Sequence, residues 1–334
     1  MRNRLMASIG IVIFGVALSA QGPVNAGAKV YHVARTAWGD PDLSGNYTNK
    51  YEQGTPMERP AGFEGKSVYQ VTGAELAAAV QKRKDESDAR APFLAGDPTG
   101  NIRGNAAFGD RDDMIHGHRA WMIVDPPDGR IPATIPDAQA RIRALPRTGS
   151  SFSNGPFAGP EELSLYDRCI TRGYPSSMLP AIYGDSYQVV QGQGWVGIRY
   201  EMIHETRIIP LDGRPHPSRN IRLDMGDARG HWDGDTLVVD TTNFKTRSVY
   251  RNADPETLHV VERFTRTAAN TLVWRVTIED AHTWARPWTF ELPLTINDAE
   301  PVFEYACHEG NYAMRNMLSA SRATDKAAAD LARK

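Results

Sequence analysis

Hydrophobic and polar positions alternate in the second half of the chain, a pattern typical of half-buried β-strands. From Tyr187 onward, short segments rich in Val, Ile, Thr and aromatic residues are separated by turns. They predict strands at Tyr187–Gln191, Trp195–His204, Arg207–Ile209, Thr236–Asp240, Leu258–Thr267, Thr271–Glu279, Trp288–Leu294 and Val302–Tyr305. Asp233-Gly234 and Ala268-Ala269-Asn270 are typical of hairpin connections. Because no helix separates these strands, we expect a mainly β fold, an antiparallel meander closing into a barrel-like (lipocalin-like) sheet.

The region before residue 161 lacks this periodicity and is rich in Gly, Pro and polar residues. Thr72–Arg90 begins with a Thr cap and continues with Ala, Leu and long polar residues, which predicts a helix. A second short helix is expected at Pro136–Ala144. Arg119–Val124 predicts a strand that ends at the turn Asp125–Gly129.

The first 26 residues have the pattern of a secretory signal. Arg2 and Arg4 precede an apolar run, Leu5–Ala20, and Val24-Asn25-Ala26 supplies small residues for cleavage after Ala26. A retained membrane anchor is the alternative, but it needs about 20 apolar residues. No other segment is long and apolar enough to span a bilayer, so we expect a periplasmic or secreted protein without a membrane span after cleavage. The expected organisation is a signal peptide, an irregular region with one or two helices, a β-barrel-like domain and a helical tail, at residues 1–26, 27–160, 161–312 and 313–334.

The amino-acid composition limits the classes of protein and partner that are expected. The 334 residues are 41% hydrophobic and 23% charged, as in ordinary globular proteins. Lys and Arg number 38 against 40 Asp and Glu, a net charge of −2, so a nucleic-acid partner is not expected. In an oxidising compartment the two cysteines, Cys169 and Cys307, are expected to form a disulfide. The alternative is a thiol nucleophile or metal ligand at Cys307, beside His308 and Glu309.

Three familiar motifs do not carry a function here. Gly192–Gly197 matches the dinucleotide-binding fingerprint, but a strand follows it where a helix is required, so a hairpin turn is expected. Gly184-Asp185-Ser186 resembles an esterase signature without its strand-to-helix elbow. His116 and His118 have a spacing that suits metal binding or a solvent-facing pair. We predict neither a metal site nor a cofactor.

The β-rich half contains an unusual number of charged residues within apolar strands. Strand periodicity places Glu262 on one face with Val260 and Phe264, and Asp240 on one face with Val238. Both carboxylates are therefore expected to face the barrel interior. Inward carboxylates are costly unless they are paired with cations or hydrogen-bonded. The candidate partners are Arg207, Arg229, His204 and His308.

Carboxylates beside imidazoles provide the separated pKa values that general acid–base catalysis needs. We expect His204 to act as acid or base with Glu201 orienting it, Glu262 and His308 to form a second pair, and Arg207 to stabilise negative charge. The expected substrate-binding residues are aromatic and polar: Tyr200, His231, Trp232, Asp240, Asn243, Trp284 and Trp288. The alternative is a barrel core tied by buried ion pairs and filled by aromatic rings.

Several longer segments resemble an abundant family of exported bacterial proteins for which no activity is established. The matching segments are PDLSG (Pro41–Gly45), IVDPPDGRIP (Ile123–Pro132), EMIHETRIIPLDGRPH (Glu201–His216), GHWDGDTLVVDTTNF (Gly230–Phe244), LHVVERFTR (Leu258–Arg266) and EYACHEGNY (Glu304–Tyr312). The resemblance covers most of the mature chain and implies export and a shared architecture. It assigns no catalytic residue.

Three functional hypotheses follow. The leading one is an exported, cofactor-independent hydrolase, lyase or isomerase that acts on a small sugar-like or aromatic molecule. The second is a non-catalytic periplasmic barrel that binds a small ligand. The third is a structural or assembly factor of the envelope, which should show a packed barrel and an exposed apolar patch.

Overall fold

The computed structural model describes residues 31–95, 117–145, 155–181, 183–246 and 249–333. The predicted signal peptide and His116 lie outside these residues. The strands are β1 Gly45–Thr48, β2 Ile123–Asp125, β3 Ser186–Gly192, β4 Trp195–Tyr200, β5 Thr206–Pro210, β6 Asp227–Asp233, β7 Thr236–Thr242, β8 His259–Ala268, β9 Thr271–Glu279 and β10 Trp288–Ile296. The α-helices within the described residues are α1 Gly73–Ala95, α2 Pro136–Ala144 and α3 Ala313–Ala332.

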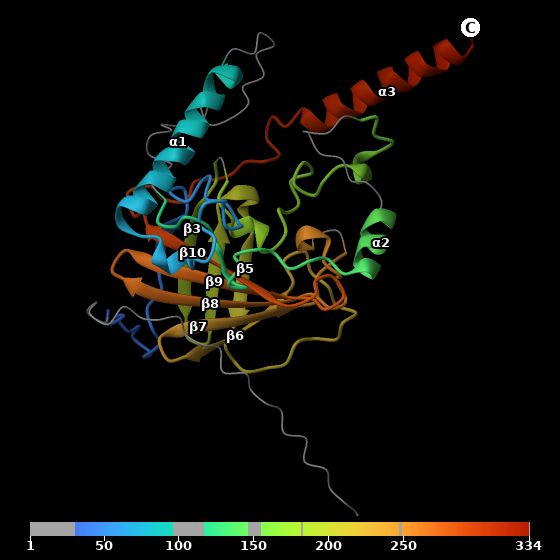
Figure 1. Ribbon diagram of the computed structural model, residues 1–334. Coiled ribbons are helices and arrows are strands. Elements are labelled where there is room, and N and C mark those ends of the chain that lie inside the picture. The colour runs from blue at the N-terminus through green and yellow to red at the C-terminus, as the bar shows by residue number, and fades with distance from the viewer. Residues whose placement is uncertain (1–30, 96–116, 146–154, 182, 247–248, 334) are drawn as a thin grey trace, which may run out of the picture. The chain divides into compact units, whose positions relative to one another are not determined.

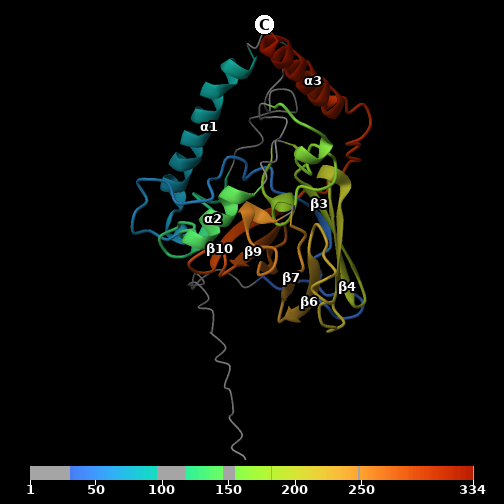
Figure 2. The same ribbon diagram turned by 90° about the vertical axis from the view of Figure 1, so that its right-hand side faces the viewer.

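Nine of these strands form one antiparallel sheet that curves into a nearly closed barrel (Figure 1). Their order is β5-β4-β3-β1-β10-β9-β8-β7-β6, and β2 pairs with β10 beside this path. The sheet therefore consists of two meanders, β3 to β5 and β6 to β10, and β1 joins them. Figure 2 shows the wall that contains β3 and β4 together with the β6–β7 hairpin. The mainly β, barrel-like prediction is confirmed.

β1 and β2 come from the region predicted to be irregular, so the expected boundary at residue 160 does not separate the sheet from what precedes it. β1 pairs through Tyr47 with Tyr187 of β3 and Ile296 of β10. A four-residue strand has too little periodicity to be recognised from sequence. The same region also covers the outer face of β10, where Glu291 is buried beneath Arg119 and Tyr69.

The barrel interior is filled by large aromatic side chains. Trp274 of β9 and Phe264 of β8 stack with their ring centroids 6.4 Å apart, and Phe290 of β10 meets Trp274 edge-on at 5.4 Å. Each of these three residues is at most 1% exposed. The alternation is strict along all of β9 and along β8 as far as Phe264, where every second residue is buried. Burial of one face of each strand holds the sheet together.

Two predicted strands are wrong in part or entirely. β4 ends at Tyr200, and the chain then turns through Met202–His204, where Ile203 and His204 have φ angles of 63° and 48°. Val302–Tyr305 is not a strand. It has no regular secondary structure, and Phe303 is 62% exposed. A segment that has no neighbouring strand to pair with cannot form the backbone hydrogen bonds of a sheet.

The predicted helices are present. The helix expected at Thr72–Arg90 is α1, which extends to Ala95, and the one expected at Pro136–Ala144 is α2. The expected C-terminal tail is α3, which contacts the segment at Phe157: Ser321 accepts a hydrogen bond from the Phe157 amide at 2.8 Å. No helix within the described ranges is long and apolar enough to cross a membrane.

Candidate functional site

Glu262 faces the barrel interior as predicted, and it forms a buried ion pair with Arg207 of β5. The Arg207 NH2 group lies 2.7 Å from Glu262 Oε2, and Trp274 Nε1 donates to Oε1 at 2.9 Å. The Tyr174 hydroxyl also donates to Oε1. Burial raises the pKa of Glu262 and the Trp274 hydrogen bond acts to lower it, while the adjacent Arg207 guanidinium favours the carboxylate form. Because both carboxylate oxygens are engaged within the core, this pair is structural.

The other predicted catalytic residues do not join this pair. His204 and His308 come together, with ring centroids 6.5 Å apart, but both are exposed. His204 Nδ1 lies 3.0 Å from the Tyr305 carbonyl oxygen. Glu201 bonds through its side chain to Ser186, and burial raises its pKa. The expected convergence of these groups in one enclosed cavity is therefore wrong, because the chain turns outward after β4 while Glu262 stays inside.

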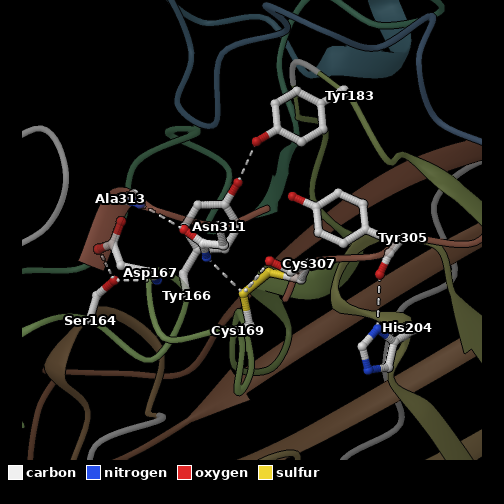
Figure 3. The surroundings of a disulfide bond; sticks show 10 residues. All are labelled: Ser164, Tyr166, Asp167, Cys169, Tyr183, His204, Tyr305, Cys307, Asn311 and Ala313. Carbon is white, nitrogen blue, oxygen red and sulfur yellow. Dashed lines mark hydrogen bonds between the residues drawn. A yellow bond between two sulfur atoms is a disulfide. The ribbon is translucent and has the colours of Figure 1, made fainter. Parts of the chain in front are cut away.

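The predicted disulfide is confirmed. The sulfur atoms of Cys169 and Cys307 are 2.02 Å apart and their Cα atoms 5.8 Å apart (Figure 3). The bond ties the irregular segment after β10 to a turn in which Cys169 has a φ of 55°. Tyr166, Tyr183 and Tyr305 lie beside it, and the rings of Tyr183 and Tyr305 stack at 6.1 Å. The alternative of a free thiol at Cys307 does not hold in this structure.

Most of the predicted substrate-binding aromatic residues pack in the core. Tyr200 and Trp288 have 0% exposure and Trp284 has 4%. Trp284 and Trp288 meet edge-on at 5.7 Å. These three residues are therefore corrected from a cavity wall to core filling. His231 is exposed on β6, and Trp232 is half-buried.

Asp240 lies on the outer face of β7, so its predicted inward orientation is wrong. Leu237, Val239 and Thr241 are the buried inward residues of this strand, whereas the Asp240 side chain is 40% exposed. Val238 shares the outer face with Asp240 and is nevertheless buried, because its cross-strand neighbours are long side chains that cover it.

Outside the barrel, Asp240 is the centre of a continuous chain of hydrogen-bonded imidazoles and carboxylates. Asp240 Oδ1 lies 2.8 Å from His216 Nε2, and Oδ2 lies 2.6 Å from His259 Nε2. His216 Nδ1 in turn lies 2.6 Å from Asp227, and His259 Nδ1 lies 2.9 Å from Glu279. We call these five residues the imidazole–carboxylate cluster.

Four adjacent strands and one loop position the cluster, with Asp227 at the start of β6. Asp240, His259 and Glu279 stand on the adjacent strands β7, β8 and β9, and His259 is directly opposite Glu279 in the ladder. His216 comes from the irregular segment between β5 and β6. This segment is fixed by Asn243, whose side-chain amide donates to the Pro217 carbonyl at 3.1 Å.

The cluster separates the proton affinities of its members. Hydrogen bonds to Asp240 and Glu279 raise the pKa of His259 to about 9. The hydrogen bond from His259 lowers the pKa of Glu279. Burial acts to raise the pKa of Asp240, but the hydrogen bonds and charges of His259 and His216 lower it overall. At neutral pH, His259 is therefore an imidazolium between two carboxylates.

An open pocket of about 470 Å³ lies against this cluster, and we call it the imidazole pocket. His216 and His259 line one side. Arg219, Arg222, Asn243 and Glu256 line the remainder together with short segments of their loops. Its volume falls within the range of about 300–1,000 Å³ typical of small-molecule sites. Of the predicted binding residues, Asn243 lines this pocket and Asp240 lies directly behind it.

The raised pKa of His259 makes its contribution to stability pH-dependent. Because the folded-state value of about 9 exceeds the ordinary 6.5, the contribution is complete below pH 6.5 and is lost as the pH rises through 9. We expect His259→Gln to lower the free energy of unfolding by about 2 kcal/mol at the acidic end, after allowance for partial exposure. Denaturant unfolding of the native protein and of His259→Gln, at several pH values between 6 and about 9, measures this difference in the free energy of unfolding. A difference that does not shrink toward pH 9 contradicts the assignment.

A metal site does not account for the cluster. Across the described ranges, no group of three or more His, Cys, Asp or Glu side chains is arranged to hold a metal ion. His118 belongs to a separate ion pair, with its Nδ1 2.7 Å from Glu52. The hydrogen bond to Glu52 raises the pKa of His118.

Sequence reasoning missed His216 and did not select His259 or Glu279. One signal was present: the predicted hairpin at Ala268-Ala269-Asn270 places His259 opposite Glu279 if the two strands pair symmetrically about Ala269. The contact between His259 and Asp240 had no such signal, because a long loop separates β7 from β8 and leaves their register undetermined.

Comparison of the chain with protein-family models, with curated proteins and with solved structures gives no match. The function is therefore argued from the geometry and chemistry of the site.

Proposed function

We propose that the chain is an exported, cofactor-independent enzyme that performs acid–base chemistry on a small anionic molecule bound in the imidazole pocket. The observation that carries the proposal is the Asp240 carboxylate shared between two imidazoles at the wall of an open pocket. Titratable groups with separated pKa values at hydrogen-bond distance beside a pocket are the arrangement that general acid–base catalysis requires.

The cluster supplies both roles. His259 is the proton donor, because its pKa of about 9 keeps it charged at neutral pH. Asp240, ionised at neutral pH because its pKa is lowered, keeps His259 charged and holds its imidazole in place. Glu279 bonds the opposite nitrogen of His259 and fixes the ring. After His259 has given a proton to the substrate, Asp240 and Glu279 hold the neutral ring in an orientation that lets it take a proton back.

The rest of the pocket favours an anionic substrate. Arg222 is paired with Glu256 at 2.5 Å. Arg219 is exposed, and no acceptor among the described residues bonds its guanidinium. A carboxylate or phosphate group on the substrate would supply that partner. Export is part of the proposal, and the Cys169–Cys307 disulfide supports it because such bonds persist in oxidising compartments.

The test compares native protein with Asp240→Asn. A panel of small carboxylic acids, sugar acids and phosphate esters is first screened for thermal stabilisation of the native protein, and the compounds that bind are assayed for conversion by mass spectrometry. We expect Asp240→Asn to lower the rate of conversion about a hundredfold, because the carboxylate that keeps His259 charged and oriented is lost.

Asp233→Asn is the matched control. Asp233 lies on β6, is 62% exposed and is paired only with Arg263 among the contacts of the described chain. We expect this variant to convert substrate at the native rate. Equal rates for both variants contradict this role of Asp240.

A second candidate is a non-catalytic binding pocket for the same class of molecule. Both ring nitrogens of His259 already face carboxylate oxygens, so proton donation requires one of these hydrogen bonds to break first, whereas binding does not. Stabilisation of the native protein by an anionic compound, weakened in Arg219→Gln and without conversion, supports binding over catalysis. If every compound in the panel raises the melting temperature of the native protein by no more than it raises that of Arg219→Gln, both candidates fail.

A further inference from the structure

A second, smaller hollow lies between the turn that follows Leu163 and the single helical turn Tyr250–Asn252. Its volume is about 180 Å³, below the range of about 300–1,000 Å³ that accommodates drug-sized ligands. Ser164, Thr171 and Ser176 supply hydroxyl groups to its lining, and Tyr166 supplies an aromatic ring. Ser164 and Tyr166 are labelled in Figure 3, where they lie near the disulfide. The hollow can hold one small polar ion.

The charges on this lining are of one sign. Arg172 and Arg251 both line the hollow, and none of its ten lining residues is acidic. Two carboxylates bond hydroxyls of the lining: Asp167 accepts from Ser164, and Glu205 accepts from Thr171 at 2.8 Å. Two arginines therefore line the same small space without an acidic residue on the lining itself.

One of these guanidinium groups has a buried donor without an acceptor. The NH1 atom of Arg172 is inaccessible to solvent and makes no hydrogen bond to any described residue. Leaving a charged donor unsatisfied in a buried position is costly, so such groups normally have a partner. Nη1 has no surface open to the adjacent hollow, so an oxyanion there would become its partner after a rotation of the guanidinium group.

The second guanidinium group is held in place by strained backbone. Arg251 and Asn252 have φ angles of 51° and 59°, in the left-handed region that side chains other than glycine rarely adopt. The Tyr250 hydroxyl accepts a hydrogen bond from Arg251 Nε at 3.1 Å. Strain of this kind persists where the surrounding structure fixes a functional side chain.

We propose that this hollow is a binding site for a small oxyanion, a phosphate or carboxylate group, bound between Arg172 and Arg251. Guanidinium groups suit this ligand because each presents a planar set of donors that matches two oxygen atoms. Ser164 and Thr171 already donate to Asp167 and Glu205, so among these lining hydroxyls Ser176 is the one that can add a donor. The site is independent of the imidazole pocket and of its proposed chemistry.

The test is isothermal titration calorimetry in the Arg219→Gln protein, which removes the free guanidinium of the imidazole pocket. The probes are inorganic phosphate, acetate and chloride, each at the same total ionic strength. We expect saturable binding of phosphate, acetate or both, and none of chloride. Binding of phosphate alone identifies a tetrahedral oxyanion site, and binding of acetate alone identifies a carboxylate site.

Three additional substitutions locate the binding. Adding Arg172→Gln or Arg251→Gln should weaken it about tenfold or more. Arg251 is exposed, so its substitution does not threaten the fold. Adding Arg214→Gln is the control for net charge, because Arg214 is 60% exposed and bonds its neighbour Asp212. The proposal is overturned if no oxyanion binds saturably, if chloride binds equally well, or if Arg214→Gln weakens binding as much as the other two.

Discussion

Replacing Arg207 with methionine should lower the free energy of unfolding by about 3–5 kcal/mol, because it leaves the carboxylate of Glu262 uncompensated in the core. The two side chains are 3% and 0% exposed. Arg207 also donates to Thr241 at 3.1 Å, and its guanidinium lies 3.8 Å from the centre of the Tyr174 ring. Because Glu262 is closed to solvent, water cannot replace these contacts, and their removal lowers the free energy of unfolding.

Denaturant unfolding measures the effect, with Arg263→Met as the control. Arg263 stands next to Glu262 on β8 but pairs with Asp233 at the surface, where the two side chains are 40% and 62% exposed. Its substitution should cost at most about 1 kcal/mol. Adding Glu262→Gln to Arg207→Met should restore part of the loss, because glutamine is neutral and still accepts from Trp274. An Arg207→Met protein as stable as Arg263→Met would show that the pair is not structural.

Removing the disulfide should lower the free energy of unfolding by up to about 5 kcal/mol. Cys169 and Cys307 are 138 residues apart in sequence, and a bond that closes so long a loop strongly restricts the unfolded chain. Residues 301–306 have no regular structure to hold them once the bond is absent. We therefore expect a local effect as well: the segment between β10 and α3 should become the first site of proteolytic cleavage.

The measurement compares oxidised and reduced native protein with the variant Cys169→Ser, Cys307→Ser. Reduction should destabilise the native protein to the level of the double variant and leave the double variant unchanged. The position of the first cleavage by a nonspecific protease is read by mass spectrometry. A stability difference below about 1 kcal/mol, or an unchanged cleavage pattern, contradicts this role of the bond.

The sequence was sufficient for the fold class because period-two alternation is strong where one face of a strand is buried. It identified the strands β8 and β9, and on β8 also the inward face that carries Glu262. β1 was not expected, since a strand of four residues lacks a readable period. The strand expected at Arg119–Val124 is β2, which comprises only Ile123–Asp125. Their position in the sheet depends on partners far away in sequence.

The candidate site was predicted less well because the sequence of β7 does not determine which of its residues face the barrel interior. Leu237, Val238 and Val239 are consecutive apolar residues, so alternation does not determine which face they define. Assigning Asp240 to the face of Val238 was right, but that face is the outer one. The cluster itself depends on a cross-strand register and on the position of His216, and only the tertiary structure determines these.

β1 has a consequence for how the protein reaches its native state. Tyr47 of β1 pairs with Ile296 of β10, about 250 residues later in the chain, so the two meanders cannot be joined until nearly all of the polypeptide has emerged. Such high contact order slows folding. Until closure, β3 and β10 each present an open edge able to pair with another chain. We therefore expect refolding yield to fall as protein concentration rises.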